Sequence, residues 1–138
     1  MKVLLIFAVL CIMSIESTEI HKYIVDKWSS LMQPHKEFCI KESNVDPEHV
    51  HQMLRKGYKL DVPQFHEYMR CMYVKLGMLS EEGEFQELEI LKKADYLNYN
   101  LLKKCIKQAT HEKNHSKKSY KLCECVIKGL EDPCSYTV

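Results

Sequence analysis

The chain has 138 residues with 20 basic and 19 acidic side chains, so its formal net charge is +1. This balance gives no electrostatic reason to expect nucleic acid or an anionic membrane surface as a partner. Only four glycines and four prolines are present, which disfavours an all-β chain with many tight turns.

Residues 1–17 have the pattern of a secretory signal peptide. Lys2 provides a basic start, residues 3–13 form an apolar run, and the small residue Ser17 stands at a cleavage position. The apolar run is too short to cross a membrane, which takes about 20 residues, and no later segment qualifies. We therefore expect cleavage after Ser17, no membrane insertion, and a secreted, extracellular single domain at residues 18–138.

Helical patterns fill the first half of this domain. Apolar residues recur with a helical period over residues 20–32, and Pro34 interrupts the pattern before a second helical segment through residues 38–40. The sequence Asp46-Pro47-Glu48 is typical of a helix start, and Gly57 of a helix end.

The next pattern begins at Asp61-Val62-Pro63 and ends at Gly77. It is the third helix when the two segments around Pro34 are counted as one. It carries one apolar stripe, made of Phe65, Met69, Met72 and Leu76.

The second half continues in the same way. Residues 80–83 predict a turn, and Phe85, Leu88 and Leu91 suggest a short helix. Asp95 can cap the next helix, residues 111–115 predict a loop, and a last helix covers residues 116–130 before Asp132-Pro133. The inward face of the helix after Asp95 is expected to hold Leu97, Leu101, Leu102, Cys105 and Ile106. The whole pattern predicts an all-α fold of about six helices with no strand.

Six cysteines remain once Cys11 has left with the signal. An even number in a secreted chain favours disulfides over metal ligation or thiol catalysis. Six cysteines allow 15 connectivities, so the count alone does not give the pairing. The six are Cys39, Cys71, Cys105, Cys123, Cys125 and Cys134.

Residues 65–85, FHEYMRCMYVKLGMLSEEGEF, resemble the central signature of the insect odorant- and pheromone-binding protein family. In that signature two cysteines separated by three residues are followed by a Leu-Gly turn and an acidic-Gly loop. Cys71 falls on the second cysteine of the pair, and Glu67 stands at the position of the first. The resemblance implies a disulfide-stapled helical fold around an internal apolar pocket.

The carboxyl-terminal cysteines support the same alignment of this chain with the family's cysteine positions. The family's last two cysteines are separated by eight residues, and counting back from Cys125 places Ser116 at the earlier position. Glu67 and Ser116 therefore replace two cysteines that bond to each other in the family, which is the pattern of its minus-C type. The loss of this bridge is expected to loosen the third helix against the sixth and to make the pocket more adaptable.

The resemblance also implies the bridges Cys39–Cys71 and Cys105–Cys125. Cys123 and Cys134 lie outside the family pattern, and Cys123–Cys134 is the simplest third bridge, because residues two apart on a helix face different partners. The rival arrangement joins Cys105 to Cys123 and Cys125 to Cys134.

The candidate ligand-binding residues centre on the third helix. Methionine is pliant and suits ligands of varied shape, although the same apolar stripe is also typical of an ordinary helical core. The candidates are Phe65, Tyr68, Met69, Met72, Tyr73, Leu76, Leu101 and Tyr120.

Three polar features carry further hypotheses. Glu67 is either a partly exposed glutamate at the rim of the pocket or a buried one that bonds a ligand or Ser116. Asn114-His115-Ser116 is an N-glycosylation sequon. Most of the seven histidines are expected to be solvated, with acid-triggered ligand release as the alternative. They are His21, His35, His49, His51, His66, His111 and His115.

No catalytic signature is present: there is no Gly-rich phosphate loop, GxSxG or HExxH. We expect no enzyme activity, no cofactor and no metal. The resemblance implies a carrier of small hydrophobic ligands such as odorants or pheromones, with a chemoreceptor or a second copy of the chain as candidate partners. The alternatives are a salivary or venom-type scavenger of biogenic amines or lipid mediators, and a recognition protein that acts through its surface.

Overall fold

Helices follow one another through residues 22–56 and 60–131, the parts of the chain that the computed structural model describes. Within these residues the only β pairing is an isolated bridge between Leu79 and Phe85. The all-α expectation is therefore confirmed. After a helix at residues 22–32 come η1 (Gln33–His35), α2 (Lys36–Ser43), α3 (Pro47–Lys56), α4 (Pro63–Lys75), α5 (Glu87–Lys93), α6 (Tyr99–Thr110) and α7 (His115–Glu131).

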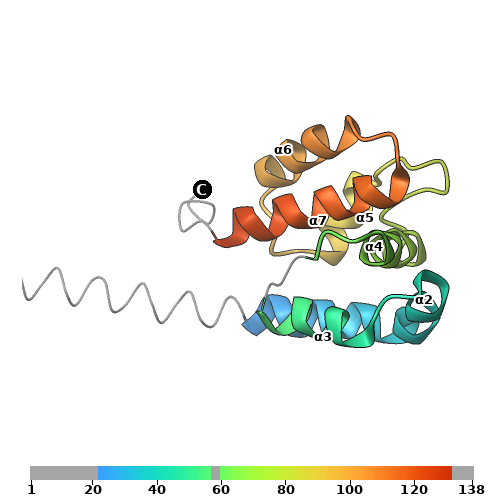
Figure 1. The fold of residues 1–138 in the computed structure, drawn as a ribbon. Coiled ribbons are helices and arrows are strands. Elements are labelled where there is room, and N and C mark those ends of the chain that lie inside the picture. The colour runs from blue at the N-terminus through green and yellow to red at the C-terminus, as the bar shows by residue number, and fades with distance from the viewer. Residues whose placement is uncertain (1–21, 57–59, 132–138) are drawn as a thin grey trace, which may run out of the picture.

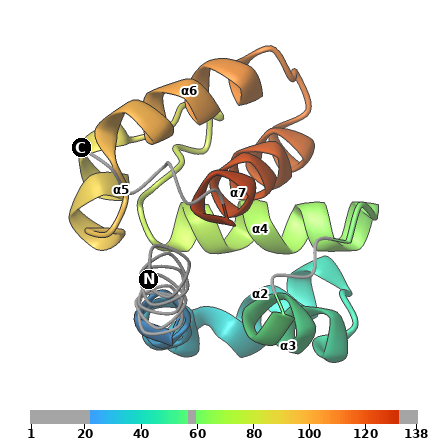
Figure 2. The same cartoon turned by 90° about the vertical axis from the view of Figure 1, so that its left-hand side faces the viewer.

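Helix α4 occupies the middle of the structure. Figure 2 shows it between a layer formed by residues 22–32, α2 and α3 and a second layer formed by α5, α6 and α7. The most extensive packing is that of α4 on α7, of α6 on α7 and of α2 on α4. Figure 1 shows the same order from the side, with α7 lying across α4 and α6 outermost. Both faces of α4 are thus covered by other helices.

The predicted helix boundaries have clear local causes. The carboxylate of Asp46 accepts a hydrogen bond from the backbone N–H of Glu48 at 2.9 Å, and Pro47 opens α3. Pro34 lies in η1, where the chain passes from the first helix into α2 without leaving helical geometry. Gly77 ends α4 with a φ of +70°, which a glycine adopts without steric cost.

The prediction that Asp95 caps a helix is wrong. Helix α6 begins at Tyr99, and the side chain of Asn98 accepts the capping bond from the N–H of Asn100 at 2.7 Å. Asp95 lies in the turn before this point, too early to reach the first free N–H groups. It instead accepts hydrogen bonds from Lys27 at 2.9 Å and from Tyr23 at 3.0 Å, so it joins this turn to the first helix.

The short helix α5 is present, but its buried side differs from the stripe that suggested it. Leu88 is 83% exposed, whereas Ile90 is 4% exposed. Phe85 precedes the helix and lies in the bridge to Leu79. The apolar stripe therefore identified a helix without identifying its inner face, because seven residues give too few turns for the period to define one.

The predicted turn at residues 80–83 packs against α7. Gly83 has a φ of +84°, and the ring of His115 lies 2.5 Å from where a Cβ on Gly83 would be. The ammonium group of Lys118, a buried residue, donates to the carbonyl of Gly83 at 2.9 Å. Glycine is required here by both its conformation and the close approach of His115.

In the described part of the chain, two disulfides join pairs of helices. Cys39–Cys71 joins α2 to α4, and Cys105–Cys125 joins α6 to α7. These are the two pairings that the family resemblance implies, and the second is incompatible with the rival Cys105–Cys123 arrangement. The sequence-based predictions that lie outside the described residues are the signal at 1–17, the environment of His21, the helix end at Gly57, the stop at Asp132-Pro133, and the bonding of Cys134.

We predict that replacing either pair by serines, as C39S/C71S or C105S/C125S, lowers the free energy of unfolding by about 3–4 kcal/mol. Each bridge closes a loop, with sequence separations of 32 and 20 residues, and so restricts the unfolded chain. Urea unfolding of the oxidised variants and of the wild-type protein would measure this. A loss below about 1 kcal/mol for both pairs would contradict the prediction.

Candidate functional site

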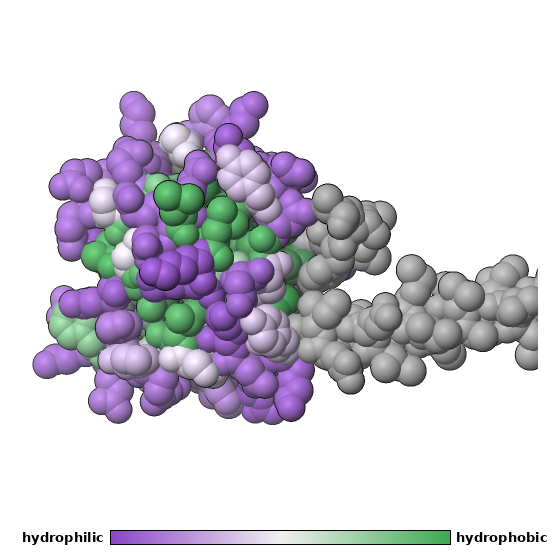
Figure 3. Space-filling view, turned by 180° about the vertical axis from the view of Figure 1, so that it is seen from behind, coloured by the Kyte–Doolittle hydropathy of each residue, from purple (hydrophilic) through white to green (hydrophobic). Residues whose placement is uncertain are grey.

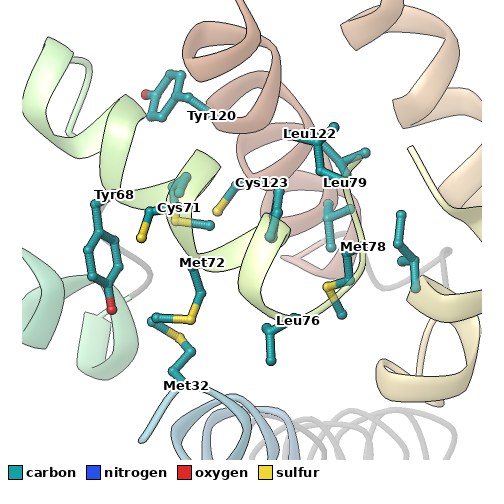
Figure 4. Packing of buried hydrophobic residues seen from close by; sticks show 14 of the residues in the cluster. Met32, Tyr68, Cys71, Met72, Leu76, Met78, Leu79, Tyr120, Leu122 and Cys123 are labelled. Atoms are coloured by element: carbon teal, nitrogen blue, oxygen red, sulfur yellow. The ribbon is translucent and has the colours of Figure 1, made fainter. Parts of the chain in front are cut away.

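Seven of the eight candidate ligand-binding residues lie in one buried cluster. Five come from α4, the sixth is Leu76 at its C-cap, the seventh is Tyr120 of α7, and each is at most 7% exposed. The eighth, Leu101 of α6, is only partly buried and packs against the edge of this cluster. Figure 4 shows the side chains of α4 projecting both toward α7 and toward Met32 of the first helix. The buried members are Phe65, Tyr68, Met69, Met72, Tyr73, Leu76 and Tyr120.

Methionines from other elements complete the cluster. Met32 from the first helix, Met53 from α3 and Met78 after the Gly77 turn are all buried in the same cluster as Met69 and Met72. Sequence reasoning did not single out these three as site residues. Met78 stands outside any helix, so no helical period could have indicated it. The unbranched thioether side chain adapts to irregular space, so this interior can repack at low cost.

A chain of rings ties α4 to α7. The Phe65 ring lies 6.2 Å from the Tyr68 ring and 6.2 Å from the Tyr120 ring, the second contact being edge to face. The His66 ring lies 4.6 Å from Tyr120, and its Nε2 is 2.7 Å from a carboxylate oxygen of Asp61. His66 is the buried histidine of the described residues, and its partners hold it at the start of α4.

The buried tyrosine hydroxyls differ in their surroundings. Burial raises the pKa of Tyr73 well above its ordinary value, and the neighbouring Cys123, which is also within hydrogen-bonding reach, raises that pKa further. Burial raises the pKa of Tyr120 to about 12, with the charge of Glu124 as a smaller cause. Burial also raises the pKa of Tyr68, whose hydroxyl has no hydrogen-bond partner in the structure. All three phenols are therefore neutral at pH 7.

No carboxylate is buried among the described residues. The buried polar or charged side chains there are Ser43, His66, Lys118 and Ser119. A cationic ligand group inside the cluster would lose its hydration without gaining an opposite charge from an acidic side chain, which is strongly unfavourable. The interior is therefore poorly suited to cationic molecules.

Glu67 lies at the rim of the cluster, and its side chain is 40% exposed. Its carboxylate accepts a hydrogen bond from the Ser116 hydroxyl and faces the Arg70 guanidinium at 3.6 Å. Glu67 and Ser116, which the sequence resemblance places at the positions of an absent bridge, are thus in direct contact. This contact forms a polar link between α4 and α7.

Two open hollows lie outside this cluster. A groove of about 510 Å³ between α6 and α7 is lined mainly by polar side chains, with Leu101 and Gly129 at its apolar edge. A smaller hollow of about 190 Å³ lies beside α2 and α4, with Phe38, Glu67 and Cys71 among its lining residues. Neither of these two hollows reaches the other seven candidates. In Figure 3 the face opposite to that of Figure 1 is mostly hydrophilic, with apolar side chains gathered near its middle.

Residues 22–56 and 60–131 contain neither a metal-binding cluster nor a membrane-spanning helix. No group of three or more His, Cys, Asp or Glu side chains is arranged to hold a metal ion there. No helix in that part of the chain has the length and apolar character needed to span a membrane.

Comparison with known proteins agrees with the arrangement of helices and bridges. The model of the PBP/GOBP family matches residues 22–129, which is most of the chain. The chain belongs to the PBP/GOBP family. This is a family of small-molecule carriers, so membership supports binding rather than catalysis. No curated protein and no solved structure matches this PBP/GOBP member.

We predict that the protein loses stability as pH rises above about 10. The unfolded tyrosines ionise near pH 10, whereas Tyr68, Tyr73 and Tyr120 keep their protons to higher pH in the folded state. Unfolding therefore releases protons in this range, and the stability present below pH 10 falls as pH rises toward the native pKa of about 12 at Tyr120. Urea midpoints at pH 8 and pH 11 would measure the loss.

A Y68F/Y120F variant is the control for this prediction, because it lacks two of the three phenols. It should lose less stability than the wild-type protein between the two pH values. An equal loss in both proteins would show that other groups cause the alkaline transition.

We also predict that Ser116→Ala lowers the free energy of unfolding by about 1 kcal/mol. The change removes the hydroxyl that donates to Glu67 across the α4–α7 contact. Lys117→Ala, on the exposed face of the same helix turn, should change stability by less than about 0.5 kcal/mol. Chemical unfolding of both variants would test the link, and equal effects would argue against it.

Proposed function

We propose that this protein is a secreted carrier that binds small hydrophobic molecules, such as odorants or pheromones, reversibly and without altering them. The observation that carries this proposal is the neutral cluster around α4. It combines pliant methionines with aromatic rings, and disulfides anchor the helices on both sides of it. The proposed binding residues are Phe65, Tyr68, Met69, Met72, Tyr73, Leu76, Leu101 and Tyr120.

The composition of the interior favours apolar ligands over biogenic amines. An ammonium group needs an acidic partner when it leaves water, and the described residues place no carboxylate inside the cluster. Glu67 is the nearest acidic candidate from the sequence, but it lies partly exposed and is engaged by Ser116 and Arg70. An amine scavenger therefore fits this interior less well than a carrier of uncharged compounds.

Secretion is part of the proposal. Residues 1–17 would be removed as a signal peptide, leaving the domain at residues 18–138, and the disulfides suit an oxidising extracellular medium. The exposed Asn114 precedes α7, and its side-chain oxygen accepts a bond from the N–H of Lys117 at 2.9 Å. This bond uses the amide oxygen and leaves the amide nitrogen, where a glycan attaches, available.

We further propose that the protein is of the minus-C type. The contact between Glu67 and Ser116 supports this assignment, because these two side chains stand at the positions of the absent bridge. A hydrogen bond can open and close on ligand entry where a disulfide cannot, so the pocket should be more adaptable. A third bridge between Cys123 and Cys134 completes the proposal.

The test is displacement of the fluorescent probe N-phenyl-1-naphthylamine from the oxidised protein. We expect uncharged volatile compounds to displace it at micromolar concentration, because the neutral interior accepts them without burying charge. Histamine and serotonin, measured side by side, should displace it at least about tenfold less well, since one missing charge partner costs more than 1.4 kcal/mol.

Three results would contradict the carrier proposal. Preference for the amines would indicate the scavenger function. Failure of the folded protein to bind the probe or any of the compounds would rule out an internal pocket and favour a surface-acting recognition protein. Chemical change of a bound compound, followed by mass spectrometry, would indicate an enzyme.

A further inference from the structure

The hydroxyl group of Tyr68 is a buried polar group without a partner. Tyr68 is 0% exposed, and no donor or acceptor lies within hydrogen-bonding distance of its oxygen. Buried polar groups in native proteins are nearly always hydrogen-bonded, so an unpaired one calls for an explanation. Phenylalanine would fill nearly the same space without leaving this group unsatisfied.

The four buried residues with polar or charged side chains, by contrast, have partners. Ser43 donates to the carbonyl of Cys39 at 2.6 Å, and Ser119 donates to that of His115 at 2.8 Å. The buried Lys118 and His66 also have the partners given above. Tyr68 therefore differs from these four residues, because its hydroxyl has no partner.

The methionine side chains on the same side of α4 as this hydroxyl can rearrange to admit a ligand. Figure 4 shows the Tyr68 ring directed away from Tyr120, with its hydroxyl on the same side of α4 as Met72 and Met32. Both methionines are at most 2% exposed. Methionine has several rotatable bonds and repacks easily, so a small molecule can enter between α4 and the first helix by moving these two side chains.

We propose that the Tyr68 hydroxyl selects ligands by donating a hydrogen bond to one uncharged oxygen, such as the carbonyl of a ketone or ester, on an otherwise apolar molecule. This inference rests on the proposed carrier function and specifies the chemistry of its ligand. The ligand oxygen supplies the partner that the protein lacks, while the hydrocarbon part takes the place that the methionine side chains leave. A hydrocarbon of the same shape leaves the hydroxyl unpaired and binds more weakly.

The experiment compares 2-nonanone with 2-methyl-1-nonene, in which a methylene group replaces the carbonyl oxygen. Displacement of N-phenyl-1-naphthylamine by each compound is measured for the wild-type protein, for Tyr68→Phe and for Tyr99→Phe. Tyr99→Phe is the control, because the Tyr99 side chain is half exposed. We expect Tyr68→Phe to weaken the ketone about tenfold and the alkene less than about twofold. Tyr99→Phe should change neither.

The melting temperature of the ligand-free proteins gives a second measurement. Removing an unpaired buried hydroxyl should leave the melting temperature of Tyr68→Phe unchanged or raise it, so weaker binding cannot come from damage to the fold. A lower melting temperature together with equal effects on both compounds would assign the hydroxyl to a structural water and overturn the proposal.

The proposed function and this inference fail in different ways. If the wild-type protein binds neither compound, the carrier proposal fails and the inference fails with it. If the wild-type protein binds both, and Tyr68→Phe affects them equally, only the role of Tyr68 is wrong.

Discussion

The burial of α4 on both sides is the constraint on which the rest of this structure depends. A helix in a small domain usually keeps one side in water, but α4 packs on α2 and on α7 at once. Its sequence therefore carries apolar or aromatic residues beyond a single stripe, with Tyr68 and Tyr73 buried as fully as Met69 and Met72. Whatever this interior binds must lie against α4.

The links that hold α4 differ on its two sides. Toward α2 the Cys39–Cys71 disulfide is covalent, so this contact cannot open in an oxidising medium. Toward α7 the contact relies on ring packing and on the bond between Ser116 and Glu67. The Cys105–Cys125 bridge joins α7 to α6 and not to α4. In the described residues no disulfide joins α6 or α7 to α4, so the α4–α7 contact is the one at which a carrier with an adaptable pocket would need freedom.

The buried polar groups fall into two kinds: some hold the fold together, and one is available to bind a ligand. Lys118, bonded to the Gly83 carbonyl, fixes the turn after α4, and His66, bonded to Asp61, holds the start of α4. Tyr68 has no such role, because nothing in the structure pairs with its hydroxyl. The absence of buried carboxylates from the described part of the chain disfavours cationic partners. These features together favour an apolar ligand with one oxygen.

Local patterns in the sequence determined the helices and most of their ends, because capping and left-handed glycines act within a few residues, as at Asp46 and Gly77. Cysteine spacing and the family signature indicated both bridges. Contacts between distant segments were decided only by the tertiary structure. Asp95 bonds Lys27 instead of capping α6, and Met78 joins the cluster from outside a helix. The unpaired hydroxyl of Tyr68 depends on every neighbouring element at once, so no local pattern could have indicated it.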